Sequence, residues 1–176
     1  MKKILFFLFL FIANNSYSQN SKYQAELYAG YSIGVGYYDD MDRLTIDFVN
    51  GIRFSNQLFL GFGASADHYL NYSAFVSTEP YTTNAYSVYF NGKRYLQINQ
   101  KSDFFFTGDI GYNFRSSKMD GVQGVFFTPG LGVCFKINKI GINTVLGYKY
   151  ILTKPYGYQD ANNSDSALTF RVGIVF

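Results

Sequence analysis

Apolar and polar residues alternate along most of this chain. In the stretch AELYAGYSIGVGY, residues 25–37, the odd positions carry Ala, Leu, Tyr, Ile and Val, and the even positions carry mainly Gly, Ser and Glu. A period of two predicts a β-strand, because successive side chains of a strand point to opposite faces. The same alternation predicts eight strands in all, over residues 23–38, 44–54, 58–69, 86–98, 104–115, 123–136, 140–151 and 167–176.

The connections between these strands alternate in length. Those after the second, fourth and sixth strands are tight (SNQ, NQKSD and NKI), whereas those after the odd strands are longer and polar, such as LNYSAFVSTEPYTTNA. Transmembrane barrels have this asymmetry, with short periplasmic turns and longer external loops. Strands of about ten residues, tilted by about 45°, also match the height of an apolar membrane band. The predicted fold is therefore an all-β, eight-stranded antiparallel up-and-down transmembrane β-barrel, with both termini periplasmic.

The first 18 residues have the pattern of a secretory signal peptide. Lys2 and Lys3 precede an apolar core over residues 4–13, and Ser16 and Ser18 are small residues that suit cleavage after Ser18. Ten apolar residues are too few to cross a membrane as a helix. We expect residues 1–18 to be removed and residues 19–176 to form the barrel domain.

Composition narrows the classes of partner. Charged residues make up 15% of the chain, against about 25% in an average soluble domain. Without Lys2 and Lys3, 13 basic and 12 acidic residues remain, so no basic excess favours nucleic acid. The one cysteine, Cys134, cannot form an intramolecular disulfide, and its parity predicts a small buried side chain.

Side-chain volume indicates which face of the strands points outward. A soluble barrel would show the same alternation with its faces exchanged. However, the apolar face carries about seventeen Tyr and Phe residues, while 13 of the 17 glycines fall on the polar face. An eight-stranded barrel is just wide enough to be filled by side chains, so we expect these rings outside and small or charged residues inside. The polar face carries ten charged residues that we predict to form an ion network in the lumen: Glu26, Asp47, Arg53, Asp67, Lys93, Asp109, Arg115, Lys136, Lys149 and Arg171.

Three positions depart from the pattern. Arg94 falls on the apolar face, close to the NQKSD turn, and we expect it to extend to the membrane interface. Pro129 lies within a predicted strand and predicts a bulge at Pro129–Gly130. The Asn91–Gly92 pair leaves a hairpin turn open as an alternative within the fourth strand.

With these features, the chain from about Tyr23 to Phe176 resembles the small eight-stranded outer-membrane barrels of the OmpA/OmpX-like superfamily. The resemblance implies a location in the outer membrane of a Gram-negative bacterium. It also implies that the barrel-assembly machinery reads the last strand, where Phe170, Val172, Ile174 and Phe176 share one face. Members of this superfamily include structural barrels, adhesins and narrow pores, so the resemblance does not choose among these roles.

Candidate chemistry is sparse. Some similar barrels are lipid A hydrolases, in which a catalytic His is followed two residues later by Ser; here His68 is followed by Leu70, so we expect an interfacial His. Acids in the connections could bind a cation or be simply solvated: Asp39, Asp40, Asp42, Asp160 and Asp165. No spacing typical of a Ca²⁺ loop or a phosphate loop is present in the sequence.

The sequence thus predicts a monomeric, non-enzymatic outer-membrane barrel without cofactor or metal. Its expected partners are outer-membrane lipid, the barrel-assembly machinery and a surface ligand at four external loops. A narrow porin-like pore and a lipid-modifying enzyme remain the alternatives.

Overall fold

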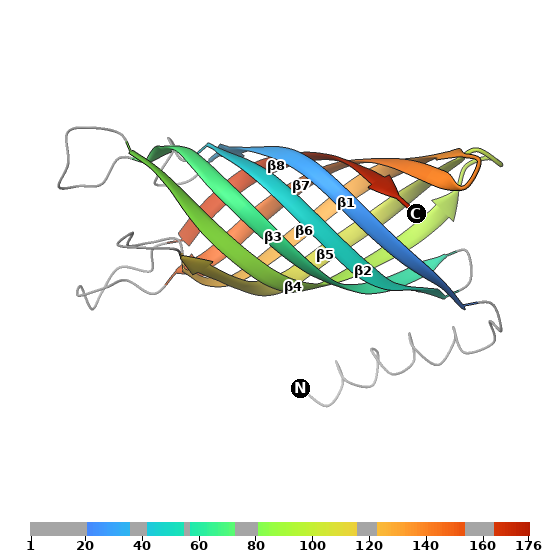
Figure 1. Cartoon of the computed structure of the whole chain (residues 1–176), viewed down its shortest axis with the longest axis horizontal. Coiled ribbons are helices and arrows are strands. Elements are labelled where there is room, and N and C mark those ends of the chain that lie inside the picture. Colours follow the sequence, from blue (N-terminus) through green and yellow to red (C-terminus); the bar gives the residue numbers. More distant parts are fainter. Residues whose placement is uncertain (1–20, 36–41, 55–56, 73–80, 116–122, 154–163) are drawn as a thin grey trace, which may run out of the picture.

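The structure is a computed structural model that describes residues 21–35, 42–54, 57–72, 81–115, 123–153 and 164–176. The predicted signal peptide lies outside these residues. The described residues form eight strands that close into one barrel, each strand antiparallel to its neighbours and β8 pairing with β1 (Figure 1). The strands are β1 (Ser21–Gly34), β2 (Arg43–Phe54), β3 (Leu58–Tyr72), β4 (Tyr81–Gln97), β5 (Ser102–Arg115), β6 (Gly124–Ile137), β7 (Ile140–Thr153) and β8 (Ser164–Val175).

The strands are steeply staggered. Following paired residues once around the barrel from Lys22 leads back to Ser32 of the same strand, ten residues further along. Stagger and tilt are linked in a closed barrel, and tilts of roughly 35–45° are typical. The oblique course of the strands in Figure 1 agrees with this geometry. The predicted eight-stranded antiparallel barrel is therefore confirmed.

The strand pairing tests two predictions, a hairpin turn at Asn91–Gly92 and a bulge at Pro129. β4 runs without interruption through Asn91 and Gly92, which pair with Gly61 and Leu60 of β3, so the hairpin alternative is wrong. The bulge expected at Pro129 is also wrong. Pairing of β6 with β7 stops at Phe127 and resumes at Gly130 in the same register, so the missing proline donor interrupts the ladder without inserting a residue.

The two ends of the barrel differ. We call the end with the connections after β2, β4 and β6 the turn end, and the opposite end the loop end. One of these turns contains Asn138 with a φ of 56°, a left-handed conformation that tight hairpin turns require. The longest predicted loops, 70–85 and 152–166, are shorter than expected, because β3, β4, β7 and β8 extend into both segments; residues 73–80 and 154–163 between these strands lie outside the described residues.

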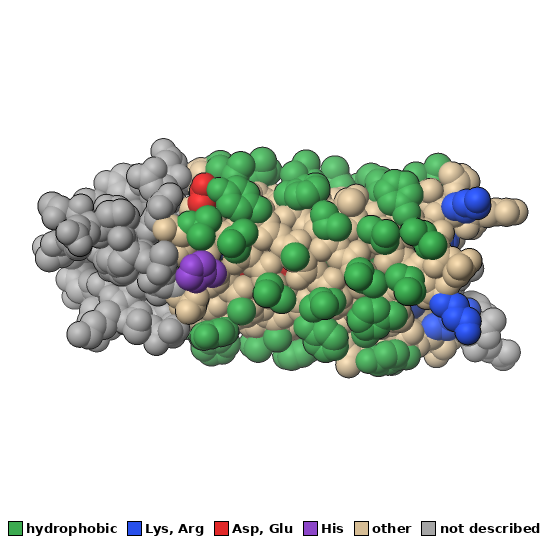
Figure 2. Space-filling view, turned by 45° about the horizontal axis from the view of Figure 1, so that its top comes forward, with side chains coloured by type: hydrophobic (Ala, Val, Ile, Leu, Met, Phe, Trp, Pro, Cys, Tyr) green, Lys and Arg blue, Asp and Glu red, His purple; other side chains and the backbone are tan. Residues whose placement is uncertain are grey.

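The outer face of the barrel is apolar. Large apolar side chains cover it along its length in Figure 2, with exposed fractions such as 62% for Ile46 and 68% for Phe90. Alternate residues point inward and are buried, which gives β6 and β8 a strictly alternating burial over most of their length. Such a continuous apolar outer surface is not tolerated in water. Within the described ranges, no helix is long and apolar enough to cross a membrane.

Candidate functional site

The lumen contains a balanced set of charges. Among the described residues, six basic and six acidic side chains point into the barrel and form ion pairs with one another. From the loop end to the turn end, these pairs are Arg43–Asp165, Lys149–Asp67, Arg171 with Asp47 and Asp109, Lys93–Glu26, and Arg53 and Lys136 with Asp103. Buried charges need such partners, since an unpaired charge in the interior is very costly.

At the loop end, two pairs lie next to each other. Arg43 is fully buried, and its Nη1 lies 3.1 Å from Asp165 Oδ2 and donates to the Tyr69 hydroxyl at 2.8 Å. Lys149 Nζ lies 2.7 Å from Asp67 Oδ2, while the Thr45 hydroxyl donates to the other oxygen of Asp67. These contacts link strands β2, β3, β7 and β8 across the lumen.

Arg171 occupies the middle of the barrel. Its guanidinium lies 3.0 Å from Asp109 Oδ2 and 3.6 Å from Asp47 Oδ2. The Tyr89 hydroxyl donates to Asp47 Oδ1 at 3.0 Å, and Asn91 Nδ2 donates to Asp109 Oδ1. The cation of β8 is thereby tied to carboxylates of β2 and β5.

Lys93 and Glu26 form the next layer. The Lys93 ammonium donates to Glu26 Oε2 and, at 2.9 Å, to the Tyr28 hydroxyl. Glu26 also accepts bonds from Tyr28 and from Gln24 Nε2, both at 2.6 Å. The ammonium lies within about 6 Å of three ring centroids, the range of a cation–π interaction: those of Tyr28, Phe59 and Phe105.

At the turn end, one carboxylate serves two cations. Arg53 Nη2 and Lys136 Nζ lie 3.1 Å and 2.7 Å from the two oxygens of Asp103. The Arg53 guanidinium also lies over the Tyr95 ring, 3.9 Å from its centroid. This layer lies close to the tight turns, where the side chains of Arg53 and Lys136 are 15% and 36% exposed.

Of the ten charged residues predicted for the lumen, the structure brings nine into these pairs. The tenth, Arg115, ends β5, and its side chain lies outside the described residues. Sequence reasoning missed Arg43 and Asp103, and it placed Asp165 in a loop, which is wrong because Asp165 lies in β8 and is buried. All three lie at strand ends, beyond or just before the predicted boundaries. The alternation of inward and outward side chains, extended by a few residues at the strand ends, would have found them.

The lumen also contains more aromatic rings than we expected from the narrow interior of an eight-stranded barrel. Seven rings of the described residues are buried inside it, besides the many on the outer face: Tyr28, Phe59, Tyr69, Tyr89, Tyr95, Phe105 and Phe126. Inward-facing glycines make room for several of them. A Cβ on Gly61 would lie 2.7 Å from Phe59 Cζ, and a Cβ on Gly63 would overlap the Tyr89 ring. Glycine on the polar face therefore accommodates rings from its own strand and from neighbouring strands.

Space for a small molecule such as water lies among these side chains. A cavity of about 20 Å³ lies at the level of Asp47 and Arg171, with Thr169 and Lys149 also in its lining. This volume holds roughly one water molecule. Asp47 Oδ2, Thr169 Oγ1 and Arg171 Nε have no hydrogen-bond partner within the protein, so they are suited to bind such a water.

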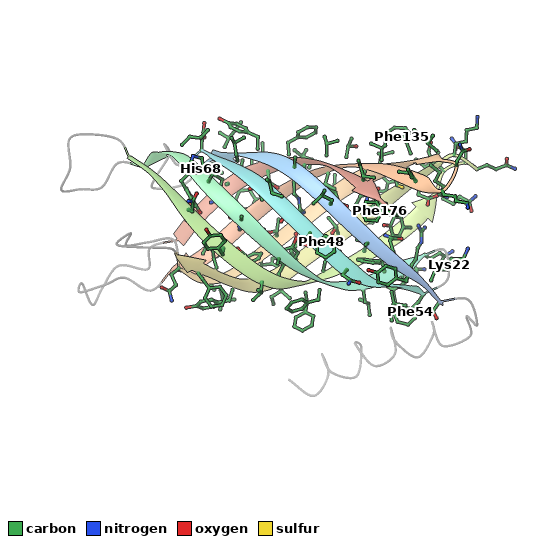
Figure 3. The ribbon with its side chains drawn as sticks, in the orientation of Figure 1. Lys22, Phe48, Phe54, His68, Phe135 and Phe176 are labelled. Atoms are coloured by element: carbon green, nitrogen blue, oxygen red, sulfur yellow. The ribbon has the colours of Figure 1, made fainter. Side chains whose placement is uncertain are left out.

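The remaining candidate residues form no catalytic arrangement within the described residues. His68 is exposed on the outer face near the loop end, where its Nδ1 lies 2.8 Å from Asn84 Oδ1 (Figure 3). Asp42 accepts bonds from the Tyr31 hydroxyl and the Gly34 amide, while Asp39, Asp40 and Asp160 lie outside the described residues. Cys134 is buried, and no described group of His, Cys, Asp and Glu could hold a metal ion.

Comparison with solved structures shows the fold. No family model matches the sequence, and no curated protein matches it. Neisserial surface protein A (NspA) aligns with a TM-score of 0.62 at 14% identity, covering 89% of this chain and 98% of that one. The outer membrane enzyme PagL aligns with a TM-score of 0.51 at 10% identity, covering 84% of this chain and 97% of that one. The chain has the fold of the small eight-stranded outer-membrane barrels.

Proposed function

We propose that this protein is a non-enzymatic, monomeric integral protein of the Gram-negative outer membrane, with a closed lumen and external loops that contact a surface partner. The observation that carries the proposal is the apolar outer belt around a closed sheet. A barrel leaves no backbone edge unpaired in hydrocarbon, and the belt matches lipid rather than water.

Cell fractionation combined with gel mobility before and after heating tests the location. We expect the protein in the detergent-extracted outer-membrane fraction, with a faster-migrating band before heating, as folded barrels show. Recovery in the aqueous periplasmic fraction without detergent would refute the proposal. In the proposed orientation, the turn end and both termini are periplasmic, and the last strand, ending at Phe176, is recognised by the barrel-assembly machinery.

The lumen supports a closed barrel over the alternative of a narrow pore. Its charges are paired in layers along the barrel, and the central cavity holds roughly one water. Planar-bilayer recordings separate the two functions. We expect no channels from the native protein and leak currents from Asp109→Ala, which removes a carboxylate that Arg171 contacts. Discrete channels in the native protein would favour the pore.

The active role that we propose for the loops is adhesion or partner binding. The sequence over residues 70–85 and 152–166 is rich in Tyr, Asn and Ser, which suit adaptable surface contacts. Replacing the parts of these segments that lie between the strands, residues 73–80 and 154–163, by short turns is expected to abolish surface binding while leaving the folded barrel in the membrane. Unchanged surface phenotypes would end the adhesion proposal. The fold is shared with an enzyme, PagL, so lipid modification remains the alternative that a His68→Ala strain tests.

A further inference from the structure

The turn end of the barrel carries a surface whose exposed and half-buried charged side chains are basic. We call Lys22, Arg94, Lys101, Lys136 and Lys139 the turn-end basic patch. Figure 2 shows Lys and Arg side chains at the end opposite the large group of grey residues, and Figure 3 places Lys22 there. The acidic side chains of this half, Glu26 and Asp103, are buried and already paired in the lumen.

Within this patch, a cleft lies between the β4–β5 turn and the end of β6. Asn99, Gln100, Lys101 and Ser102 line one side, and Phe135, Lys136 and Ile137 line the other. The exposed fractions of the two apolar side chains are 48% for Phe135 and 55% for Ile137, and both continue the outer apolar belt. One side of the cleft is thus polar and basic, and the other borders the region assigned to lipid.

The turn that presents Lys101 is held in place by hydrogen bonds. The Lys101 amide donates to Asn99 Oδ1 at 2.8 Å, and the Lys101 carbonyl accepts from the Lys136 amide at 2.8 Å. Among the described residues, Lys101 forms no ion pair, so its ammonium is available to an external anion. Lys136 reaches Asp103 but remains 36% exposed.

We propose that this cleft binds the headgroup of an anionic glycerophospholipid, with its phosphate at Lys101 and its acyl chains against Phe135 and Ile137. The inference rests on the proposed membrane location. A free phosphate would use the polar side alone, whereas a phospholipid uses both sides. Lysines near a membrane surface attract anionic lipids, each by an amount that corresponds to about a fivefold change in binding.

The test compares two exposed lysines in neighbouring turns. The full mature chain, Lys101→Gln and Lys139→Gln are reconstituted into phosphatidylcholine vesicles containing spin-labelled phosphatidylglycerol or spin-labelled phosphatidylcholine. The motionally restricted fraction of each labelled lipid gives their relative association constants. We expect the native chain to prefer phosphatidylglycerol. Lys101→Gln should lower that preference at least about twofold more than Lys139→Gln does, since Lys139 lies outside the cleft and shares only the general attraction of a basic surface for anionic lipid.

Equal association of both lipids with the native chain, or an equal loss in both variants, would overturn the proposed site. Loss of the preference on adding inorganic phosphate at constant ionic strength would assign the cleft to free phosphate instead. Gel mobility before heating is read on the same vesicles. A chain that does not insert refutes the membrane proposal itself, whereas a folded, inserted chain without preference refutes the lipid site alone.

Discussion

Replacing Lys93 by Met is expected to destabilise the barrel by about 3–5 kcal/mol, because it leaves a buried carboxylate without its cation. Glu26 is fully buried, and the side chain of Lys93 is only 2% exposed. Water therefore cannot replace the lost partner at this position. The methionine side chain is similar in length to that of lysine and keeps the packing against Phe59 and Phe105.

The remaining contacts of Glu26 set the size of this effect. The carboxylate keeps its bonds from Tyr28 and Gln24, both at 2.6 Å, and hydrogen bonds to a charged group contribute about 1.5–3 kcal/mol each. We therefore expect a loss near the lower end of the range, about 3 kcal/mol. Glu26→Gln should cost a similar amount, since it leaves the ammonium among three rings and one hydroxyl. Combining both changes removes both charges and should cost at least about 2 kcal/mol less than the sum of the single effects.

Urea titration in lipid vesicles, read by gel mobility without heating, gives the free energy of unfolding for each variant. Lys139→Met serves as the control, because Lys139 is exposed in a turn and should stay within about 0.5 kcal/mol of the native chain. The reasoning is refuted if Lys93→Met costs less than about 1 kcal/mol or if the two lumen substitutions are additive within error.

Three further predictions concern packing, assembly and chemistry. Gly61→Ala should lower the free energy of unfolding by about 1–3 kcal/mol, because its Cβ would lie 2.7 Å from Phe59 Cζ. Gly92→Ala, whose Cβ would have its nearest atom at 3.8 Å, should change the free energy of unfolding by less than about 0.5 kcal/mol. Equal effects of the two substitutions in urea titration would contradict the faces assigned to these glycines. Deleting Phe176 should lower the amount assembled in the membrane more than it lowers the stability of the refolded barrel, and normal membrane levels on immunoblots would count against this. His68→Ala should leave the lipid profile in mass spectrometry unchanged, and a lost modification would reveal an enzyme.

The fold was predictable because a barrel repeats one simple rule. The period of two survives in every strand, so strand number, connection lengths and the two faces follow from the sequence. The positions of the strand ends were harder to predict, because polar residues there are compatible with either a solvated loop or an inward-facing position in the lumen. Asp165 illustrates this ambiguity: within a run of loop-like residues it looks solvated, but the extended β8 places it against Arg43.

The contents of the lumen were only partly predictable. The alternation along each strand places Glu26, Lys93 and Arg171 inside the barrel. Which charges form ion pairs depends on the stagger of ten residues, which brings together side chains of strands that are not neighbours. The inward rings were underestimated for the same reason. Gly63 and Tyr89 lie opposite each other on adjacent strands, so the space that glycine leaves is visible only once the register is known. At Pro129, the sequence suggested a bulge, but the neighbouring pairs hold the register without one.

The most direct test of the central account is the environment of Phe48, which points outward from β2 in the middle of the barrel (Figure 3). A spin label is attached to Phe48→Cys in a Cys134→Ser background, and the protein is reconstituted in lipid vesicles. Electron paramagnetic resonance then measures collisions of the label with oxygen and with a water-soluble nickel chelate. We predict frequent collisions with oxygen and few with nickel, as for a side chain within the hydrocarbon. The opposite ratio would show that this face meets water and would contradict the membrane barrel.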